Sequence, residues 1–383
     1  MSTGKLGIVG LLGLHYYVRD LERSRHFYVD RLDFEEIGKG SAALERDGRQ
    51  RSLVFRAGDI AITCSTPAGE GGRAARYLTH HPDGIGTVAF EVENARHAFE
   101  VLDACGGTPI TEVQTYQDDL GRIETFSITT PFGDTTFRFT ERHGTRALFP
   151  GMETYPSPRG GKNAMRFERI DHITSNFQTM APALLWLEHV MGFVPLWEIE
   201  FHTRDVAKSR VHEGSGLRSK VMWDPASGIK LANNEPYRPS FKGSQINVFH
   251  EQHHGDGIQH AALSTADILH SVENLRARGV SFMPTPKTYY EALPARLQAL
   301  GVKLEEDARE LERLQILVDG AGPGKYLLQI FLQDSAGLYG AAEAGPFFFE
   351  IIQRKGDPGF GAGNFRALFE SIEREQEPPA GSG

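Results

Sequence analysis

The sequence predicts an α+β fold of four βαβββ-type modules, two in each half of the chain, which form two open half-barrels curled around cavities. This prediction rests on internal similarity, because a pattern that recurs along the sequence indicates a structural unit that recurs in the fold. Three pairs of segments match between the halves: residues 11–38 with 166–200, residues 84–107 with 257–280, and residues 133–142 with 345–354.

The first pair opens each half with a strand, a helix and a turn into the next strand. Residues 7–14 are short and Gly-rich, lack a small-x-small cleavage site and lead directly into His15, so they are expected to form a first strand and not a signal peptide. The corresponding strand of the second half carries His172. An amphipathic helix is expected after each strand, followed by an Asp-Phe or Gly-Phe step into the next one.

The other two pairs complete the modules. GIGTVAF (84–90) and GIQHAAL (257–263) are expected to be strands, each followed by a helix. GDTTFRFTER (133–142) and GPFFFEIIQR (345–354) are expected to be later strands. Residues 149–164 are rich in Pro and Gly and show no periodicity, so they are expected to link a domain at 1–150 to a domain at 165–383.

The composition limits the functions open to the chain. It has 383 residues, 40% of them hydrophobic, and a net charge of −9 with basic and acidic residues interspersed. Neither a nucleic acid nor an anionic membrane surface is therefore an expected partner. No stretch approaches the ~20 apolar residues that span a bilayer. Cys64 and Cys105 form no CxxC motif, which favours a reducing cytoplasm over a disulfide framework.

An overlay of the two halves identifies three residues of the second half that could bind a metal and whose equivalents in the first half differ. At three equivalent points the halves differ, with His172, His260 and Glu350 in the second half, and His15, Thr87 and Arg138 in the first. Threonine is a poor metal ligand, and an arginine repels a cation. Only the second half is therefore expected to hold a metal, and the first half is expected to be a domain without one.

The three residues have the composition of an iron site. Two imidazoles and one carboxylate form the facial triad of non-haem Fe(II) oxygenases, which leaves positions open for a bidentate 2-oxo acid and O2. Strand alternation places each of the three among mostly apolar neighbours on one face. A lone strand histidine is more often a satisfied core residue, but three candidates on equivalent strands favour a metal. A glutamate between Phe348 and Ile352 is also costly to bury without a cation.

Three other strings resemble functional motifs without their structural context. Residues 250–254 match HExxH, but the segment is short and bracketed by glycines, which favours a solvated loop or helix end over a zinc peptidase. Residues 320–325 are one residue short of a P-loop and are expected to form a turn. Residues 359–363 lack the strand-then-helix context of a dinucleotide site.

Further strings of interest are distributed over most of the span from about residue 165 to residue 376. They are LRSKVM (217–222), NEP (234–236), SQI (244–246), GIQH (257–260), TYY (288–290), LLQIF (327–331), FEIIQR (349–354) and GFGAGNF (359–365). In these strings the second half resembles the 4-hydroxyphenylpyruvate dioxygenase family, which has the vicinal-oxygen-chelate (glyoxalase/bleomycin-resistance-like) fold. The first half is similar only in the order of its modules.

The resemblance implies Fe(II) at His172, His260 and Glu350, in agreement with the overlay. It also implies a substrate pocket, with polar residues near a ring hydroxyl or the iron and with aromatic walls: Ser219, Asn234, Gln245, Gln259, Gln329, Asn364, Phe331, Phe348, Phe360 and Phe365. Because Gln259 precedes His260 on a strand, it should point to the opposite face, so its contact with substrate is expected to be indirect.

The tail of the chain is expected to form one more helix. Phe365, Leu368, Phe369 and Ile372 have the spacing of an ordinary amphipathic helix. We also expect this helix to close the pocket as a lid, with the glycines before it as a hinge.

The implied reaction converts 4-hydroxyphenylpyruvate and O2 to homogentisate and CO2, as in tyrosine and phenylalanine catabolism. The chain departs from the family pattern at Ala232, where a proline is common. A 4-hydroxymandelate synthase, with the same substrate and iron but oxidation at the benzylic carbon, stays open as an alternative. A metal-free small-molecule binding protein of the same fold is a more distant one. A homo-oligomer, either a dimer or a tetramer, is expected.

Overall fold

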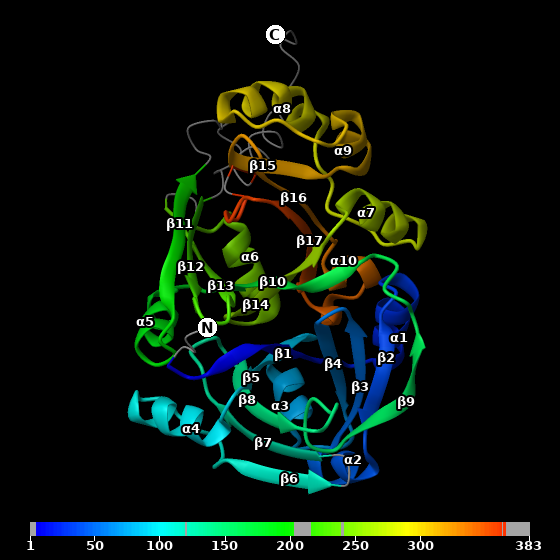
Figure 1. The fold of residues 1–383 in the computed structure, drawn as a ribbon, viewed down its shortest axis with the longest axis vertical. Helices are drawn as coiled ribbons and strands as arrows, with labels where there is room; N and C mark the ends of the chain where they lie inside the picture. Colours follow the sequence, from blue (N-terminus) through cyan, green and yellow to red (C-terminus); the bar gives the residue numbers. More distant parts are fainter. Residues whose placement is uncertain (1–4, 119–120, 203–215, 239–240, 362, 365–383) are drawn as a thin grey trace.

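Two curled, open sheets stand one above the other in the computed structural model (Figure 1). The structure describes residues 5–118, 121–202, 216–238, 241–361 and 363–364. The predicted α+β fold of four modules in two half-barrels is confirmed. The expected C-terminal helix lies outside the described residues. Within the described part of the chain, no helix is long and apolar enough to cross a membrane.

The first half contains two βαβββ modules and one additional strand. Module 1 consists of β1 (Ile8–Tyr17), α1 (Leu21–Arg25), the π-helical turn η1 (His26–Arg31), β2 (Glu35–Gly40), α2 (Ala42–Gly48), β3 (Gln50–Ala57) and β4 (Ile60–Pro67). After α3 (Arg73–His80), module 2 consists of β5 (Gly84–Val92), α4 (Ala95–Ala104), β6 (Gln114–Asp118), β7 (Gly121–Ile128) and β8 (Thr136–His143), followed by β9 (Met152–Gly160).

The second half repeats this order with longer connections. Module 3 consists of β10 (Phe167–Asn176), α5 (Ala181–His189), β11 (Val194–His202), β12 (Gly216–Trp223) and β13 (Lys230–Pro236). After α6 (Gln245–His253), module 4 consists of β14 (Gly257–Thr265), α7 (Ile268–Ala277), α8 (Lys287–Leu300), α9 (Ala308–Leu314), β15 (Leu317–Gly322), β16 (Lys325–Phe331), α10 (Ser335–Tyr339), η2 (Ala342–Ala344) and β17 (Phe348–Lys355). The turn between β15 and β16 is the one expected at residues 320–325.

The two sheets have the same topology. Their strand orders over the described residues are β6-β7-β8-β5-β1-β4-β3-β2-β9 and β11-β12-β13-β10-β14-β17-β16-β15. In each sheet the first strands of two modules pair antiparallel at the centre, and each module's last strand pairs parallel with its first. As a result β10, β14 and β17, which carry the three candidate ligands, are neighbours at the centre of the second sheet.

The segment expected to link the two domains, residues 149–164, contains a strand that the sequence did not indicate. Strand β9 extends the first sheet by pairing antiparallel with β2. It is an edge strand, and such strands tolerate residues like Pro156 and Pro158 because one side of the backbone makes no ladder bonds. Most of its side chains are exposed. Because no apolar face is buried, the sequence has no alternation here that would indicate a strand.

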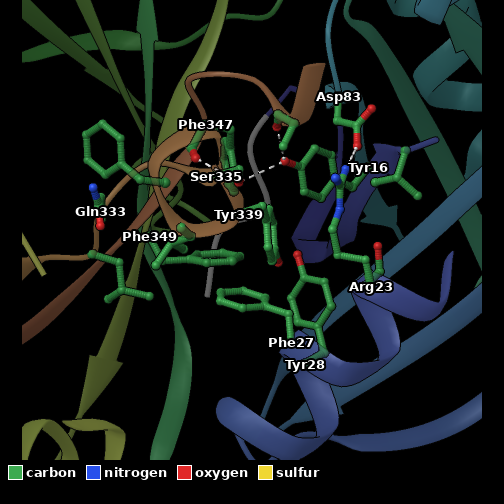
Figure 2. A pocket seen from close by; sticks show the side chains of 16 residues that line it. Tyr16, Arg23, Phe27, Tyr28, Asp83, Gln333, Ser335, Tyr339, Phe347 and Phe349 are labelled. Carbon is green, nitrogen blue, oxygen red and sulfur yellow. Dashed lines mark hydrogen bonds and ion pairs between the residues drawn. The ribbon is translucent and has the colours of Figure 1, made fainter. Parts of the chain in front are cut away.

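Aromatic residues join the two halves. Figure 2 shows Tyr16 and Tyr28 of the first half near Phe347 and Phe349 of the second. The Tyr16 and Phe347 rings are 5.3 Å apart between centroids. The hydroxyls of Tyr16 and Ser335 are 3.1 Å apart and hydrogen-bonded. The cavity that remains between these side chains measures about 20 Å³, which is too small for an organic substrate.

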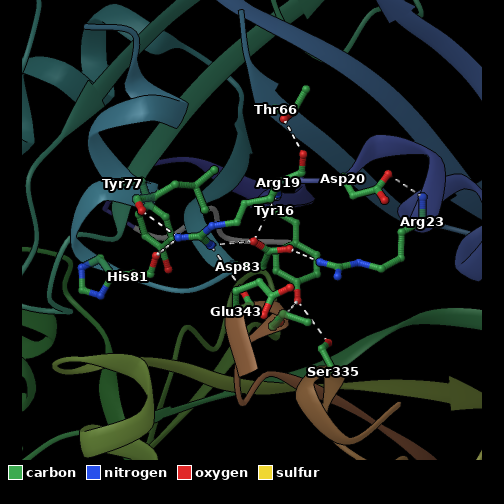
Figure 3. Close-up of polar contacts among 12 residues, drawn as sticks. Tyr16, Arg19, Asp20, Arg23, Thr66, Tyr77, His81, Asp83, Ser335 and Glu343 are labelled. Carbon is green, nitrogen blue, oxygen red and sulfur yellow. Dashed lines mark hydrogen bonds and ion pairs between the residues drawn. The ribbon is translucent and has the colours of Figure 1, made fainter. Parts of the chain in front are cut away.

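A buried carboxylate connects the same interface (Figure 3). Asp83 is 1% exposed and forms ion pairs with Arg19 at 2.9 Å and with Arg23 at 2.5 Å. Burial raises the pKa of Asp83, although both arginines oppose this shift. The backbone N–H of Asp83 donates to the carbonyl of Glu343, and Arg19 donates to that same carbonyl. The first half is thereby hydrogen-bonded to the η2 turn of the second.

Candidate metal centre

Three neighbouring strands of the second sheet bring His172, His260 and Glu350 together. Ala262 on β14 is the cross-strand partner both of His172 on β10 and of Glu350 on β17. His260 lies two residues before Ala262 and therefore points to the same face. All three side chains are buried, with 3–4% of their surface exposed. The sequence placed these residues on one face, and the structure brings their ends into contact distance.

The ligand atoms of the three residues converge on one point. The Nε2 atoms of His172 and His260 lie 3.5 and 3.4 Å from Oε2 of Glu350. The possible ligand atoms all lie within 4.8 Å of one another. Within the described part of the chain, this is the only such group of three or more His, Cys, Asp or Glu residues.

Each imidazole is hydrogen-bonded through Nδ1, the nitrogen that points away from the other candidate ligands, and this makes the arrangement suitable for a metal. Nδ1 of His172 donates to Asp171 at 2.9 Å, and Nδ1 of His260 donates to Oε1 of Gln259 at 3.1 Å. With Nδ1 protonated, a neutral imidazole carries its lone pair on Nε2. Two lone pairs and the Glu350 carboxylate then face one another as three acceptors, an arrangement that a cation stabilises. The donor set therefore fits a metal ion.

Asp171 is held in place by an arginine from β17. Arg354 donates from Nε and Nη2 to the two oxygens of Asp171, each at 2.7 Å. Burial favours the neutral acid, but the hydrogen bonds from Arg354 and His172 hold the pKa of Asp171 well below its usual range. The ionised Asp171 can only accept, which fixes the proton of His172 on Nδ1. Carboxylate–histidine pairs of this kind orient metal ligands in proteins.

The charges of the triad itself are also defined. Burial would raise the pKa of Glu350, but the two histidines, when protonated, outweigh burial and lower it to about 2. Burial lowers the pKa of His260. Burial also lowers the pKa of His172, but Glu350 and Asp171 outweigh this and raise it. Glu350 is therefore a carboxylate at neutral pH, and its negative charge favours a bound cation.

Three of the predicted aromatic residues surround the imidazoles. The Phe348 ring stacks on His260 with centroids 4.9 Å apart, and the Phe331 ring lies 6.1 Å from the same imidazole. The Phe360 ring meets His172 edge-on at 5.1 Å. The ring centroid of Trp197, a residue that the sequence analysis did not single out, lies 5.6 Å from that of Phe360. Phe365, the fourth predicted wall residue, lies outside the described residues.

A polar cluster lies on the same face, beyond His172. Ser219 on β12 is directly opposite Asn234 on β13, and Asn234 is paired with Asn176 on β10. The amide of Asn234 donates to Oδ1 of Asn176 at 3.1 Å. Nδ2 of Asn176 is buried and has no hydrogen-bond partner among the described residues. The predicted pair Ser219 and Asn234 thus forms a cluster with Asn176, which the sequence analysis missed.

The remaining predicted substrate residues take different positions. Gln259 hydrogen-bonds His260, so it supports a candidate ligand. Gln245 is the first residue of α6 and is exposed. Gln329 on β16 is 1% exposed, and its Oε1 lacks a partner among the described residues. Asn364 is buried and accepts a hydrogen bond from the Tyr289 hydroxyl at 2.7 Å.

Three residues near the triad could have been found in the sequence. Asp171 precedes His172 as Gln259 precedes His260, so each histidine follows a residue with a hydrogen-bond acceptor. Arg354 is four residues after Glu350 and therefore shares its strand face. Asn176 stands four residues after His172 in the same way. For Arg354 and Asn176 the signal is strand periodicity counted from a candidate ligand, and for Asp171 it is the position directly before one.

The register of the strands corrects one equivalence between the halves. Ala89 and Ala262 are equivalent residues of the two halves, and their partners on the first strand are Gly13 and His172. Thr87 and His260 are also equivalent, and their partners are His15 and Thr174. The equivalent of His172 is therefore Gly13, not His15. Arg138 pairs with Ala89 as Glu350 pairs with Ala262, so the other two equivalences are correct. The overlay had matched the two histidines by residue type, two positions out of register.

The HExxH-like string is the end of a helix, as expected. Residues 250–253 form the last turn of α6, and His254 is its C-cap in the left-handed conformation, with φ of 62°. His250 faces Asp256 at 3.4 Å. His254 instead contacts the backbone carbonyl of His80. The two histidines therefore do not present one helix face to a common ion.

Comparisons with known proteins agree with this fold and site. The family model of the Glyoxalase/Bleomycin resistance protein/Dioxygenase superfamily matches residues 10–136 and 169–293. A 4-hydroxyphenylpyruvate dioxygenase of Dictyostelium discoideum is 33% identical over 371 residues, covering 94% of this chain and 96% of the relative. The enzyme of that name from Caenorhabditis briggsae is 36% identical over 382 residues, covering 95% and 91%.

Among solved structures, a mutant of 4-hydroxymandelate synthase from Streptomyces coelicolor has a similar fold. Its TM-score is 0.77 at 25% sequence identity, over 97% of this chain and 100% of that one. The sequence similarity to the dioxygenases is higher and covers nearly the full length of both chains. The chain therefore belongs to the 4-hydroxyphenylpyruvate dioxygenase family, within the Glyoxalase/Bleomycin resistance protein/Dioxygenase superfamily.

Proposed function

We propose that the chain is an Fe(II)-dependent dioxygenase that converts 4-hydroxyphenylpyruvate and O2 to homogentisate and CO2. One observation supports this most strongly: two imidazole lone pairs and one ionised carboxylate converge at a buried point, in a chain whose full length matches dioxygenases of that name. Two histidines and one carboxylate are the ligand set of non-haem iron oxygenases.

In this proposal His172, His260 and Glu350 hold the iron. Bound iron would supply a redox-active Lewis acid at which a 2-oxo acid and O2 meet. Asp171 and Gln259 keep the imidazole protons on Nδ1, so that both Nε2 atoms remain ligands. Two neutral imidazoles and one carboxylate leave one positive charge on a divalent ion. That charge favours the anionic end of the substrate.

The polar cluster suits the other end of an arylpyruvate. Ser219, Asn234 and Asn176 are neutral, so they can bind a phenol through hydrogen bonds without adding charge. The free Nδ2 of Asn176 is a donor for the phenol oxygen. Phe331, Phe348 and Phe360 pack around the imidazoles and exclude water from them. Binding roles for Gln245, Gln329, Asn364 and Phe365 remain proposals based on the resemblance.

Oxygen uptake with 4-hydroxyphenylpyruvate and Fe(II) tests the proposal. The expected result is one CO2 and one homogentisate for each O2 consumed. Glu350→Gln should abolish uptake, because it removes the anionic ligand. The same substitution in the HExxH-like string, Glu251→Gln, should leave uptake unchanged. Uptake lost in both variants, or in neither, would contradict the assignment of the iron site.

Identifying the product separates the two candidate reactions. The likeness to a 4-hydroxymandelate synthase structure keeps benzylic oxidation as the alternative. Homogentisate and 4-hydroxymandelate are isomers of equal mass, so chromatography against both standards is needed. 4-Hydroxymandelate as the main product would overturn ring hydroxylation while leaving the iron site intact.

Several further expectations have their own tests. Cys64 and Cys105 are both free, which supports a reducing, cytoplasmic setting. Sedimentation would test a homo-oligomer, and limited proteolysis of the tail would test the proposed lid. We also propose that residues 1–150 form a domain without metal and residues 165–383 the catalytic domain. Separate expression of the two segments tests this division.

A further inference from the structure

The half-barrel of the first half encloses a cavity of about 320 Å³. Its lining includes Arg138 and Thr87, the register equivalents of Glu350 and His260. The lining also includes His15 and Tyr17. By strand register these two residues are the equivalents of Thr174 and Asn176 in the second half. The cavity therefore occupies the position in the first sheet that the candidate metal centre and its polar cluster occupy in the second.

The charge of this cavity is positive. Three arginines line it, Arg73, Arg76 and Arg138, and no aspartate or glutamate does so among the described residues. Arg73 donates to the backbone carbonyls of Gly86 and Asp134 and forms no ion pair with a described residue, although its charge acts on the Asp134 carboxylate. Arg138 has no ion pair with any described residue, and burial lowers its pKa. Arg73 and Arg138 are partly buried, and Arg76 is exposed. A charge that is partly removed from water and has no ion pair is stabilised by an opposite charge, so such a cavity favours an anion.

A buried histidine adds an unused hydrogen-bonding atom to the cavity wall. His15 is 4% exposed, and its Nδ1 has no partner among the described residues. Its Nε2 lies 2.6 Å from the hydroxyl of Ser65, which in turn is 2.6 Å from that of Ser52. Ser65 can donate to Nε2, so Nδ1 can carry the proton and donate to a ligand oxygen.

The rest of the wall combines neutral polar side chains with four aromatic residues, Tyr17, Tyr116, Phe126 and Phe149. The Tyr17 ring lies 4.6 Å from the His15 ring, and the Phe149 ring is stacked with that imidazole at 6.3 Å. Ile110 and Tyr116 also line the cavity, although they are 51% and 43% exposed. Exposed apolar side chains beside a cavity are typical of ligand sites. The volume is within the range of small-molecule pockets, at its lower end.

We propose that the first half binds a small organic anion, a monocarboxylate with an aromatic body, in this cavity. Arg138 binds the carboxylate, because a guanidinium and a carboxylate can form two parallel hydrogen bonds. Arg73 and the Nδ1 of His15 complete the polar end of the site, and Tyr17, Tyr116 and Phe149 enclose the ring. The ligand could be the substrate or product of the chain itself or another aromatic acid, since all share this chemistry.

Calorimetric titration of the full chain with phenylacetate tests the proposal without any variant. Phenylacetate has the carboxylate and the ring but no keto oxygen with which to chelate iron. The expected result is saturable binding below about 10 mM, weakened at least about tenfold for the neutral isostere phenylacetamide. Added salt should weaken the binding of phenylacetate more than that of the amide. Equal binding of acid and amide would overturn the proposal.

Variants locate the site and separate it from the iron. Arg138→Gln should weaken phenylacetate binding at least about tenfold, whereas Arg138→Lys should retain part of it. Glu350→Gln and removal of iron should leave it unchanged, so the result does not depend on the proposed catalytic function. Thermal unfolding shows whether each variant is folded. Binding that survives Arg138→Gln in a folded protein, or that disappears with Glu350→Gln, would place the ligand elsewhere.

Competition then distinguishes the possible sources of the ligand. If 4-hydroxyphenylpyruvate or homogentisate displaces phenylacetate from the Glu350→Gln protein, the site takes the substrate or the product of the chain. If neither does, the ligand is a different aromatic acid. Both outcomes support an anion site in the first half, and they differ only in its occupant.

Discussion

The two halves share one topology but carry different side chains at equivalent points of the sheet, with opposite charges at one of them. Glu350 of the second half stands where the first has Arg138, and His260 stands where the first has Thr87. His172 corresponds to Gly13. Core packing fixes the strands in both halves, whereas the side chains at three register positions decide which ion each half attracts. A shared fold therefore does not imply a shared site.

The difference extends to the residues that support the ligands. Asp171 corresponds to Leu12, which packs in an apolar cluster. Gln259 corresponds to Gly86, which has no side chain to support an imidazole. Arg354 corresponds to Arg142, which pairs with Glu91 at 2.8 Å and not with a residue on the first strand. A metal site in the first half would therefore require new supporting residues as well as new ligands.

The largest effect is expected when the second half receives a residue of the first. His260→Thr should reduce bound iron nearly to zero and lower kcat/KM by more than about 100-fold. The loss of a ligand should lower metal affinity more than the loss of a supporting residue, which lowers it by about 10–100-fold. Metal analysis of anaerobically purified protein and O2 uptake measure the two effects. His189→Thr, at an exposed position on α5, is the matched control. Iron binding retained in His260→Thr would remove His260 from the site.

A somewhat smaller effect is expected for the support of His172. Asp171→Asn keeps the size of the side chain but removes the charge that fixes the imidazole proton on Nδ1. Iron affinity should fall by about 10–100-fold, the usual range for such partners. Iron titration against a chelator measures it, with Asp59→Asn on the surface of the first half as control. Unchanged affinity in Asp171→Asn would mean that Asp171 serves only packing.

A moderate loss of stability is expected when Gly13 receives a side chain. Its φ is +156°, and a Cβ atom would lie 2.7 Å from the carbonyl oxygen of Ala61. Gly13→Ala should therefore lower the free energy of unfolding by about 1–3 kcal/mol, as overpacking does. Gly10→Ala on the same strand, where a Cβ meets nothing within 4 Å, is the control. If urea unfolding gives both variants equal stability, the backbone of Ala61 does not prevent a side chain at position 13. The close approach would then not explain why the first half lacks a metal-ligating residue there.

The smallest effect concerns the titration of His15. Burial, and then the charges of Arg138 and Arg73, lower its pKa well below the ordinary value of 6.5. Arg138→Gln should raise this pKa without restoring 6.5, because burial remains. NMR of labelled histidines measures the shift, with Arg142→Gln as control. A His15 pKa unchanged by Arg138→Gln would show that Arg138 does not act on the cavity.

The same pKa shift has a consequence for stability. Because the folded state holds His15 neutral, its contribution is complete above pH 6.5 and is lost as the pH falls from there toward the folded-state pKa. Arg138→Gln should make this loss smaller. Urea unfolding of both proteins between about pH 5 and pH 7 checks the sign.

Much of the fold and of the candidate centre could be predicted from the sequence. Strand alternation predicted that His172, His260 and Glu350 each project into the half-barrel, and the repeat placed them on equivalent strands; that these strands are neighbours came from the structure. Strand β9 was missed because it buries no face and so leaves no apolar period. The equivalence of His15 and His172 was wrong because residue type does not report register. The spacing to the next helix, eight residues from Gly13 and nine from His172, indicates the correct match.

The sequence by itself determined the module order, the absence of metal ligands at Thr87 and Arg138, and the three residues of the candidate centre. These depend on local periodicity and on side-chain chemistry, which the chain carries along its length. Only the tertiary structure decided that Asp171 and Gln259 hold the two imidazoles, that Asn176 joins the polar cluster, and that the first half encloses a positive cavity. These features depend on strand register and on side chains from distant segments. A local pattern can place Asp171 or Asn176 near a candidate ligand along the strand, but it does not show which side chains they contact.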